Sequence, residues 1–222
     1  IPAGTVLAPH YGRGRAQADI EAGQPLSRQQ WQDNRPGRKA ANGDAADIMK
    51  YWLDTEFIER PHSLDMISIG VVAEDGREFY AESSEVDWTK ASHWVLENVR
   101  PQLHGKGMPC IDIGYALRRF AEHDQHPVFW GYFAAFDWVL FAGLFGGLAD
   151  LPFAFPQLCL DIKQWAIELG DPELPRQTDS RHHALADARW TREAWTFLAG
   201  LHPSGAERRA FGRKNAMPAA AA

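Results

Sequence analysis

Cysteines and long apolar runs are both scarce in this sequence, and each scarcity excludes a class of protein. Only Cys110 and Cys159 occur among the 222 residues, in or beside apolar segments and without CxxC spacing. We interpret them as reduced, buried thiols that form no zinc site. No apolar run reaches the roughly 18 residues that cross a bilayer, and the first residues lack a basic segment followed by a hydrophobic one. We therefore expect a cytoplasmic protein with neither a membrane helix nor a signal peptide.

Positive charge is scarce in the central part of the chain. Residues 49–200 carry 13 Lys and Arg but 23 Asp and Glu residues, a net charge of −10, whereas residues 1–48 carry +1 and residues 201–222 carry +3. An acidic domain argues against a protein that binds nucleic acid passively by neutralising phosphates. It does not exclude a nuclease, because divalent cations held by carboxylates would supply positive charge locally.

Enough apolar material is present for one sizeable core. Hydrophobic residues make up 45% of the chain, and its length suggests a single domain. Residues 1–48 have few large apolar side chains and no hydrophobic period, so we predict a disordered extension, with the folded domain over residues 49–200. Residues 201–222 are similarly poor in core residues, and we predict a flexible, basic and alanine-rich tail there.

The order of the predicted elements indicates an α/β fold. A first strand is predicted at residues 51–54, and a hairpin over residues 66–83 turns at Asp75-Gly76. The remaining pattern predicts helices over residues 88–99, 111–123, 135–146, 161–170 and 183–200, with short strands at 127–132 and 157–160. Three antiparallel meander strands and two parallel strands then give a mixed five-stranded sheet flanked by helices. Asp161 and Gly170 are predicted to cap the fourth helix, and Leu185, Ala188, Trp195 and Leu198 to form the buried face of the last.

Two carboxylates stand two residues apart directly after an apolar run. Asp54 and Glu56 follow residues 51–53, at the predicted end of a buried strand, where an unpaired charge is costly. Ligands of α/β sheets gather at the carboxyl ends of the central strands. A bound cation would explain the pair, although an isolated pair of this kind is more often solvated at a strand end.

Three further residues could complete a cation site. Asp137 lies in the most apolar stretch of the chain, with no other Asp, Glu, Lys or Arg between Asp124 and Asp150. It could cap the following helix as readily as bind a cation. His182 and Asp187 stand near the start of the last predicted helix, where each alone would be an ordinary surface residue. Jointly, the carboxylates could hold two hard cations about 3.5–4 Å apart, and a histidine could take a proton from the attacking water.

These motifs resemble those of the DEDDh 3'-5' exonucleases, which have a ribonuclease H-like fold. That family carries Asp-x-Glu on the first strand, Phe-Asp at the head of a later helix, and a His five residues before a final Asp. Asp54-Thr55-Glu56, Phe136-Asp137, and His182 with Asp187 match this pattern in kind, order and spacing. The resemblance covers residues 49 to about 200, and within the family the chain is most similar to compact bacterial and phage 3'-5' exoribonuclease domains.

The resemblance implies a hydrolase that removes nucleoside 5'-monophosphates from the 3' end of single-stranded nucleic acid, RNA rather than DNA. It also implies two Mg²⁺ or Mn²⁺ ions per active site and His182 as the general base. The predicted metal ligands are Asp54, Glu56, Asp137 and Asp187. The expected partner is single-stranded RNA and not a membrane, and a homodimer is left open. His183 is predicted to face solvent where the last helix begins.

The chain departs from the family pattern at two places. Many members have small residues and a Gly after the first motif, and an Asn four residues before the second-motif Asp, whereas this chain has Phe57, Ile58 and Phe133 there. These departures concern how the terminal nucleotide is held, and hence the choice between RNA and DNA. Phe57 could stack on the terminal base, which is worth ~1–3 kcal/mol per base, or belong to the core. Thr55 is the other residue predicted to bind substrate.

Two alternative functions stay open on the sequence. One is a DNA 3'-5' exonuclease of the repair or proofreading type, which matched RNA and DNA oligomers would distinguish. The other is a domain without catalytic activity that binds nucleic acid or protein on the same fold. This second alternative is disfavoured, because every catalytic position holds the residue type that the chemistry requires.

Overall fold

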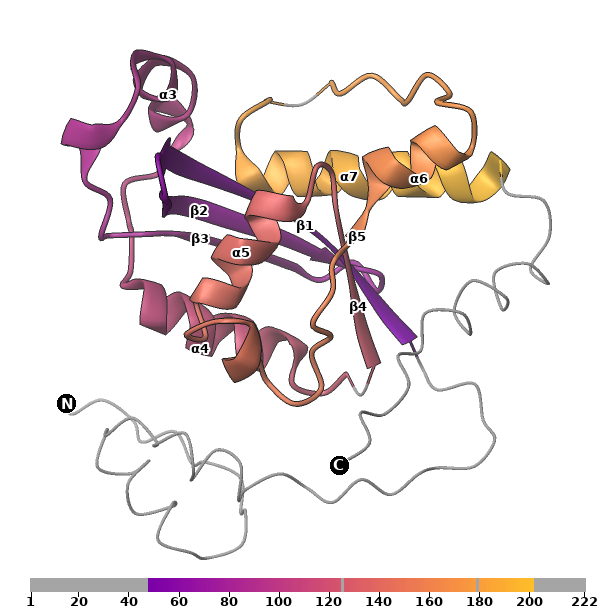
Figure 1. The fold of residues 1–222 in the computed structure, drawn as a ribbon, viewed down its shortest axis with the longest axis horizontal. Coiled ribbons are helices and arrows are strands. Elements are labelled where there is room, and N and C mark those ends of the chain that lie inside the picture. Colours follow the sequence, from indigo (N-terminus) through magenta and orange to yellow (C-terminus); the bar gives the residue numbers. More distant parts are fainter. Residues whose placement is uncertain (1–47, 125, 179, 202–222) are drawn as a thin grey trace, which may run out of the picture. The chain divides into compact units, whose positions relative to one another are not determined.

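The structure is a computed structural model that describes residues 48–124, 126–178 and 180–201 (Figure 1). The extension predicted over residues 1–48 and the tail predicted over residues 201–222 lie outside this description, apart from one residue each. Ile48 opens the first strand, and Leu201 ends the last helix.

The five strands form one mixed sheet. Strands β1 (Ile48–Arg60), β2 (Ser63–Ala73) and β3 (Glu78–Glu82) make an antiparallel meander. Strands β4 (His126–Gly131) and β5 (Leu160–Asp161) continue the sheet from β1 with parallel pairing, which gives the order β3-β2-β1-β4-β5. The predicted α/β fold of ribonuclease H-like type is confirmed.

Helices follow the strands in the predicted order. The described residues contain the α-helices α3 (His93–Asn98), α4 (Cys110–Ala121), α5 (Ala135–Gly143), α6 (Ile162–Glu168) and α7 (Ala184–Leu201). They also contain three short 3-10 helices, η1 (Trp88–Lys90), η2 (Arg100–Gln102) and η3 (Leu148–Asp150).

The helix predicted over residues 88–99 is interrupted in the structure. Ser92 has extended backbone after η1, and its hydroxyl accepts a hydrogen bond from the Val95 N–H at 3.2 Å. Serine is a preferred residue for such a helix cap, so it starts a new helix instead of continuing the first turn. Pro101 lies inside η2, just beyond α3.

Boundaries of other elements also differ from the prediction. Helix α5 ends at Gly143, three residues early, before Gly146 with its left-handed φ of 103°. Strand β5 has only two residues instead of the four predicted over residues 157–160. Asp161 caps α6 as predicted, but the helix ends at Glu168, so Gly170 lies one residue beyond its cap.

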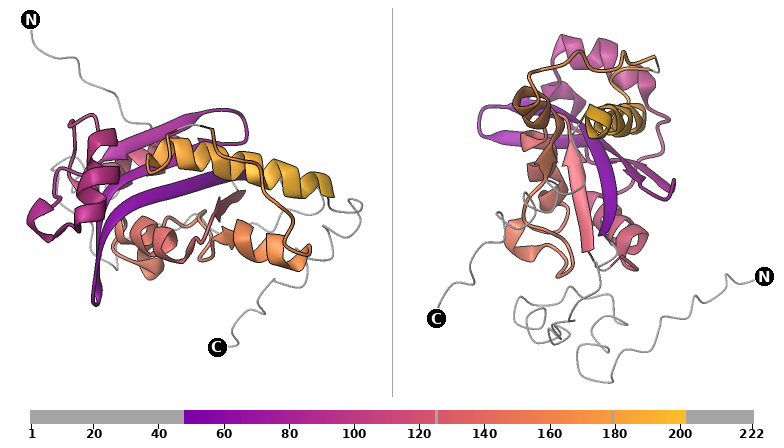
Figure 2. Two further views of the ribbon diagram at one scale, coloured as in Figure 1. Left: turned by 90° about the horizontal axis from the view of Figure 1, so that it is seen from above. Right: turned by 90° about the vertical axis from the view of Figure 1, so that its right-hand side faces the viewer.

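The two faces of the sheet are covered by different helices. Helix α7 crosses one face, and α4 and α5 cover the other (Figure 2). Along β1, Tyr51 and Leu53 are fully buried in the core under α4 and α5, whereas Trp52 contacts Trp195 of α7. Ile58 faces the same side as α7 and packs under α3. This alternation follows from the two-residue period of a strand.

Small side chains bring α7 close to the sheet. A β-carbon at Gly70 of β2 would lie only 2.4 Å from the carbonyl carbon of Ala184, so this approach requires glycine. The predicted core residues Leu185 and Trp195 are only partly buried. The inner face consists mainly of shorter residues, namely Ala184, Ala186, Ala188, Thr191, Ala194 and Leu198.

Strand β1 is much longer than predicted. It continues to Arg60, so Asp54 and Glu56 lie inside the strand and not at its end. Its parallel pairing with β4 nevertheless stops at Trp52, two residues before Asp54. Beyond that point β1 pairs only with β2, and a bulge lies between Glu56 and Phe57. Both carboxylates therefore lie just beyond the last β1 residue that pairs with β4.

Two further findings concern predictions made from what the sequence lacks. Both Cys110 and Cys159 are free thiols, and both are partly buried. Within the described residues, none of the helices combines the length and the apolarity that spanning a membrane requires.

Candidate active site

The first part of the site is the middle of β1. Asp54 and Glu56 are partly exposed, while Thr55 between them is buried. Asp54 pairs with Gly70 across the β1–β2 ladder, and the α7 backbone at Ala184 and Leu185 lies directly against Gly70. The close approach at Gly70 thus places the first turn of α7 beside the β1 carboxylates.

Asp137 reaches the site from the first turn of α5. Its Oδ1 accepts hydrogen bonds from the Thr55 N–H at 2.8 Å and from the Thr55 hydroxyl at 2.6 Å. The Asp137 side chain is only 5% exposed. The alternative that Asp137 caps its own helix is wrong, because the cap position is Ala134 and it makes no side-chain cap. The bonds to Thr55 instead tie α5 to β1.

A second aspartate holds the turn that leads into α5. The Asp161 Oδ2 accepts a hydrogen bond from the Ala134 N–H at 2.8 Å, and its Oδ1 caps α6 at the Gln164 N–H. Sequence reasoning assigned Asp161 only the cap of α6. Its contact with Ala134 fixes the loop that carries Asp137 toward β1.

Asp187 and His182 come from the start of α7. The Asp187 Oδ2 accepts a hydrogen bond from the His182 N–H at 2.9 Å, and its Oδ1 accepts one from the side-chain amide of Gln177. His182 lies in the turn before the helix and has a left-handed φ of 68°. Histidine adopts this conformation more readily than most residues. Gln177 was missed by sequence reasoning, because it belongs to an irregular stretch that has no spacing pattern.

These residues converge on one place, which we call the acidic site and define as Asp54, Glu56, Asp137 and Asp187 with His182. Ligand atoms of Glu56, His182 and Asp187 all lie within 4.8 Å of one another. The structure thus brings together the side chains that the motifs predicted. Their catalytic roles remain predictions.

The carboxylates of the acidic site disfavour one another's charge. Burial, followed by repulsion from Asp137, Glu56 and Asp187, raises the pKa of Asp54 well above its ordinary value. Burial, followed by repulsion from Asp187 and Asp137, raises the pKa of Glu56 to about 8. Burial also raises the pKa of Asp137 to about 6, although the hydrogen bonds from Thr55 act in the opposite direction. A divalent cation fits this donor set, because it would let the carboxylates be charged together.

The two adjacent histidines have different surroundings. The His182 ring stands edge-on to Trp94, with the ring centres 4.7 Å apart. The His183 ring stacks on Tyr80 at 4.6 Å and touches His104. Burial, and then the nearby His104, lower the pKa of His183. The prediction that His183 faces solvent is therefore wrong, since its side chain is partly buried in this stack.

Aromatic side chains line the approach to the acidic site. Phe57 packs against the core, and its ring centre lies 5.7 Å from that of Phe136, which is 46% exposed. Trp94 of α3, which sequence reasoning missed, is 50% exposed. Thr55 is buried with its hydroxyl bonded to Asp137, so its side chain positions this carboxylate; contact with substrate remains a prediction.

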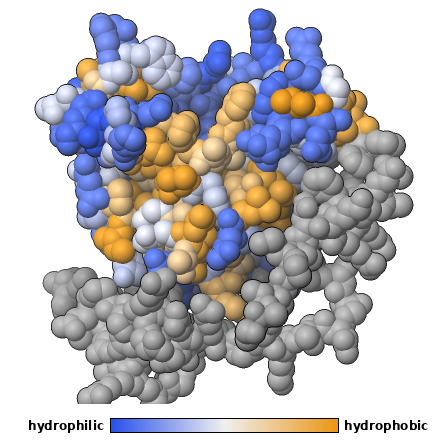
Figure 3. Space-filling view, viewed as in Figure 1, coloured by the Kyte–Doolittle hydropathy of each residue, from blue (hydrophilic) through white to orange (hydrophobic). Residues whose placement is uncertain are grey.

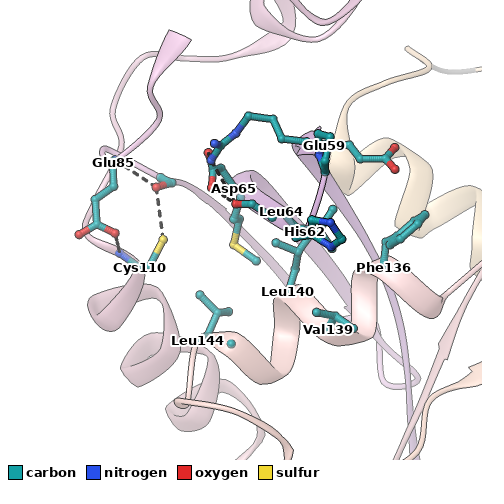
Figure 4. A pocket seen from close by; sticks show the side chains of 16 residues that line it. Glu59, His62, Leu64, Asp65, Glu85, Cys110, Phe136, Val139, Leu140 and Leu144 are labelled. Carbon is teal, nitrogen blue, oxygen red and sulfur yellow. Dashed lines mark hydrogen bonds and ion pairs between the residues drawn. The ribbon is translucent and has the colours of Figure 1, made fainter. Parts of the chain in front are cut away.

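A wide cavity of the described residues opens on the side of β1 that α5 covers. This hairpin groove, of about 950 Å³, lies between the β1–β2 turn and helices α4 and α5 (Figure 4). Its apolar lining includes Leu64, Met66, Val139 and Leu140, and apolar side chains gather on this face of the molecule (Figure 3). None of the acidic-site carboxylates lines it, so the groove is not the site predicted from the motifs.

Comparison with known proteins identifies the family. The 3'-5' exoribonuclease Rv2179c-like domain matches residues 49–199. Two proteins of Mycobacterium tuberculosis are each 36% identical over 149 residues: 3'-5' exoribonuclease MT2234.1 of strain CDC 1551 / Oshkosh and 3'-5' exoribonuclease Rv2179c of strain ATCC 25618 / H37Rv. The match covers 64% of this chain and 88% of each relative. The chain therefore belongs to the family of Rv2179c-like 3'-5' exoribonuclease domains.

Proposed function

We propose that this protein is a 3'-5' exoribonuclease that hydrolyses single-stranded RNA with two Mg²⁺ or Mn²⁺ ions. The observation that carries the proposal is the convergence of four carboxylates from β1, α5 and α7 on one partly exposed site. The raised pKa values of Asp54, Glu56 and Asp137 mean that the site favours positive charge. Hard divalent cations prefer such an all-oxygen donor set.

Asp54, Glu56, Asp137 and Asp187 would hold the cations. When bound, the cations supply positive charge that polarises the phosphodiester and activates the attacking water. Thr55 orients Asp137 through two hydrogen bonds, and Gln177 orients Asp187 together with the His182 N–H. Such contacts fix where each carboxylate oxygen points.

His182 would act as the general base. Its ring lies beside Glu56 and Asp187 and contacts the ring of Trp94. A ring nitrogen would take a proton from the water that attacks the last phosphodiester bond. The products would be a nucleoside 5'-monophosphate and an RNA shortened by one nucleotide.

The choice of RNA over DNA follows from family membership. Both relatives are named 3'-5' exoribonucleases, and the matched family carries the same description. A DNA exonuclease would degrade a deoxyribose oligomer of the same sequence at least as fast as its RNA counterpart. We expect the RNA oligomer to be degraded faster.

The polarity of attack is tested with end-blocked substrates. We expect the protein with Mg²⁺ to shorten a linear RNA from its 3' end, while a 3'-phosphate slows the reaction. A circular RNA of the same sequence should survive. Cleavage of the circular RNA at the rate of the linear one would mean an endonuclease and would contradict the proposal.

Assembly and localisation remain predictions. The composition favours a cytoplasmic protein, and a homodimer is left open. Sedimentation equilibrium of the full chain, with and without Mg²⁺, would determine the oligomeric state.

A further inference from the structure

Helix α7 begins above a row of three residues that crosses the sheet. Asp54 of β1 pairs with Gly70 of β2, and Gly70 pairs with Tyr80 of β3. Paired residues of neighbouring strands point to the same face of a sheet. Gly70 has no side chain, and the backbone at Ala184, the first residue of α7, lies directly against it. The start of α7 therefore lies between the acidic site on β1 and Tyr80 on β3.

Tyr80 contacts the turn that precedes α7. Its ring stacks on the ring of His183, with the ring centres 4.6 Å apart and the ring planes inclined by 18°. His183 directly follows His182, the predicted general base, whose φ of 68° is left-handed. A sparsely populated backbone conformation persists only where the surrounding structure fixes it. The stack on Tyr80 is one of the contacts that fix this turn.

Tyr80 is itself held by hydrogen bonds. Its hydroxyl donates to the Glu82 Oε1 at 2.9 Å. Glu82 is only 5% exposed, and its carboxylate also accepts hydrogen bonds from two backbone N–H groups of the segment over residues 102–105, at 2.6 and 2.9 Å. A buried carboxylate needs such donors. The same segment contacts the turn before α7, because the Gln102 side-chain amide donates to the Arg181 carbonyl at 3.5 Å.

We propose that Tyr80 is a positioning residue for the exoribonuclease reaction, because its stack on His183 holds His182 beside the acidic site. The inference rests on the proposed function, in which His182 takes the proton from the attacking water. The His182 N–H already donates to Asp187, and the stack adds a second contact one residue later. Tyr80 acts through the turn and not through contact with the RNA.

Two substitutions of Tyr80 separate the ring from the hydroxyl. Leucine fills much of the space of the ring but offers no flat surface for stacking. We expect Tyr80→Leu to lower kcat roughly 10- to 100-fold, because a shift of about 1 Å in a reacting group costs this much. The KM for RNA should stay within about twofold of wild type. Tyr80→Phe keeps the ring, so its kcat should stay within about threefold of wild type, and a loss as large as in Tyr80→Leu would overturn the inference.

Phe79→Leu is the matched control on the same strand. Phe79 precedes Tyr80 in β3 and points to the opposite face of the sheet, where its ring centre lies 5.7 Å from that of Phe120. The control therefore removes a partly buried ring without touching the turn before α7. Its thermal stability should fall, but its kcat should stay within about twofold of wild type. An equal loss of kcat in the two leucine variants would reflect a general loss of stability and would overturn the inference.

A second background traces the effect to His182. In His182→Asn the group that Tyr80 positions is absent, so adding Tyr80→Leu should lower the remaining rate by less than about threefold. A further loss as large as Tyr80→Leu causes in wild type would show that Tyr80 acts elsewhere, and would overturn the inference.

His183→Ala breaks the same stack from the side of the turn and leaves the sheet intact, so it decides the matter even if Tyr80→Leu fails to fold. We expect its kcat to fall, and the double variant with Tyr80→Leu to lose no more than the more impaired single variant, because both remove one contact. A wild-type kcat in His183→Ala, or losses that multiply in the double variant, would overturn the inference. Failure of the wild-type protein to degrade RNA would instead overturn the proposed function, so the two failures are distinguishable.

Discussion

At the scale of single residues, the acidic site is a group of charges that destabilise one another. Asp54 and Glu56 lie on the same strand, and Asp137 and Asp187 approach them from two helices. Burial and mutual repulsion raise the pKa of both β1 carboxylates. The folded protein therefore favours the neutral form of these two carboxylates over the charged form, which is typical of active sites.

The pH dependence of stability in chelator follows from Glu56, whose pKa rises from 4.5 to about 8 on folding. The folded state binds this proton more tightly than the unfolded state, so stability falls as the pH rises between these two values. Glu56→Gln removes the titration. We expect the variant to gain roughly 2 kcal/mol or more over wild type between pH 5 and pH 8, as measured by urea unfolding without divalent cations. If the free energies of unfolding of the two proteins changed in parallel with pH, the pKa of Glu56 would not be raised in the folded state.

A single substitution of His182 cannot separate the loss of its imidazole from a disturbance of its backbone, because this residue has a left-handed φ. His182→Asn keeps a residue that tolerates this backbone, whereas His182→Ala does not. If the imidazole is the general base, both variants should lower kcat by roughly 10² to 10⁴ and lose the acidic limb of the pH-rate profile. A kcat of His182→Asn close to that of wild type would mean that the loss in His182→Ala comes from the disturbed turn and not from the missing imidazole.

His183→Ala is the neighbouring control for that experiment. It removes the stack on Tyr80, so some loss of thermal stability is expected. The acidic limb of its pH-rate profile should remain, since the His182 ring is the one beside Glu56 and Asp187.

Motif spacing was sufficient to find the acidic residues, because their types and order are dictated by the chemistry. It could not find Gln177 or Trp94, which act through contacts between segments far apart in the chain. The surroundings of His183 were missed for the same reason, because its stacking partner Tyr80 lies on β3.

At the scale of elements, the site depends on how closely α7 approaches the sheet. The α7 backbone at Ala184 and Leu185 lies against Gly70, whose strand partner is Asp54. Any side chain at Gly70 would push the first turn of α7 outward, and His182 and Asp187 would move with it.

Gly70→Ala should therefore impair both stability and activity. The added β-carbon would lie 2.4 Å from backbone atoms, which cannot rotate away. We expect a loss of about 1–3 kcal/mol in urea unfolding, and a fall in kcat of roughly 10- to 100-fold, because shifts of about 1 Å cost this much in catalysis. Gly200→Ala, in α7 with open space around the position, should lower neither. Equal behaviour of the two variants would contradict the positioning role of this contact.

Element types were predictable from periodicity, but their lengths were not. β1 continues beyond Asp54 because β2 pairs with it as far as Arg60, and this partner is visible only in the folded sheet. On α7, Ala188 and Leu198 are buried as predicted, but Leu185 and Trp195 are only partly buried, because the face that packs on the sheet consists mainly of alanine.

At the scale of the whole molecule, the parts of the site come from distant segments of the chain. β1 provides the central pair of carboxylates, and the crossover that follows β4 provides Asp137. The final helix provides Asp187, after a loop that contributes His182 and Gln177. An acidic domain can then act on a polyanion, because cations bound at this one place reverse the local charge.

The central claim is that the four carboxylates work by holding divalent cations, and RNA hydrolysis as a function of cation tests it most directly. A 5'-labelled RNA should be shortened stepwise from its 3' end with Mg²⁺ or Mn²⁺, and should stay intact with chelator. Added cation should restore the reaction in wild type, but leave Asp54→Asn and Asp187→Asn below about a tenth of the wild-type rate. Undiminished hydrolysis in chelator, or in either variant, would contradict the account.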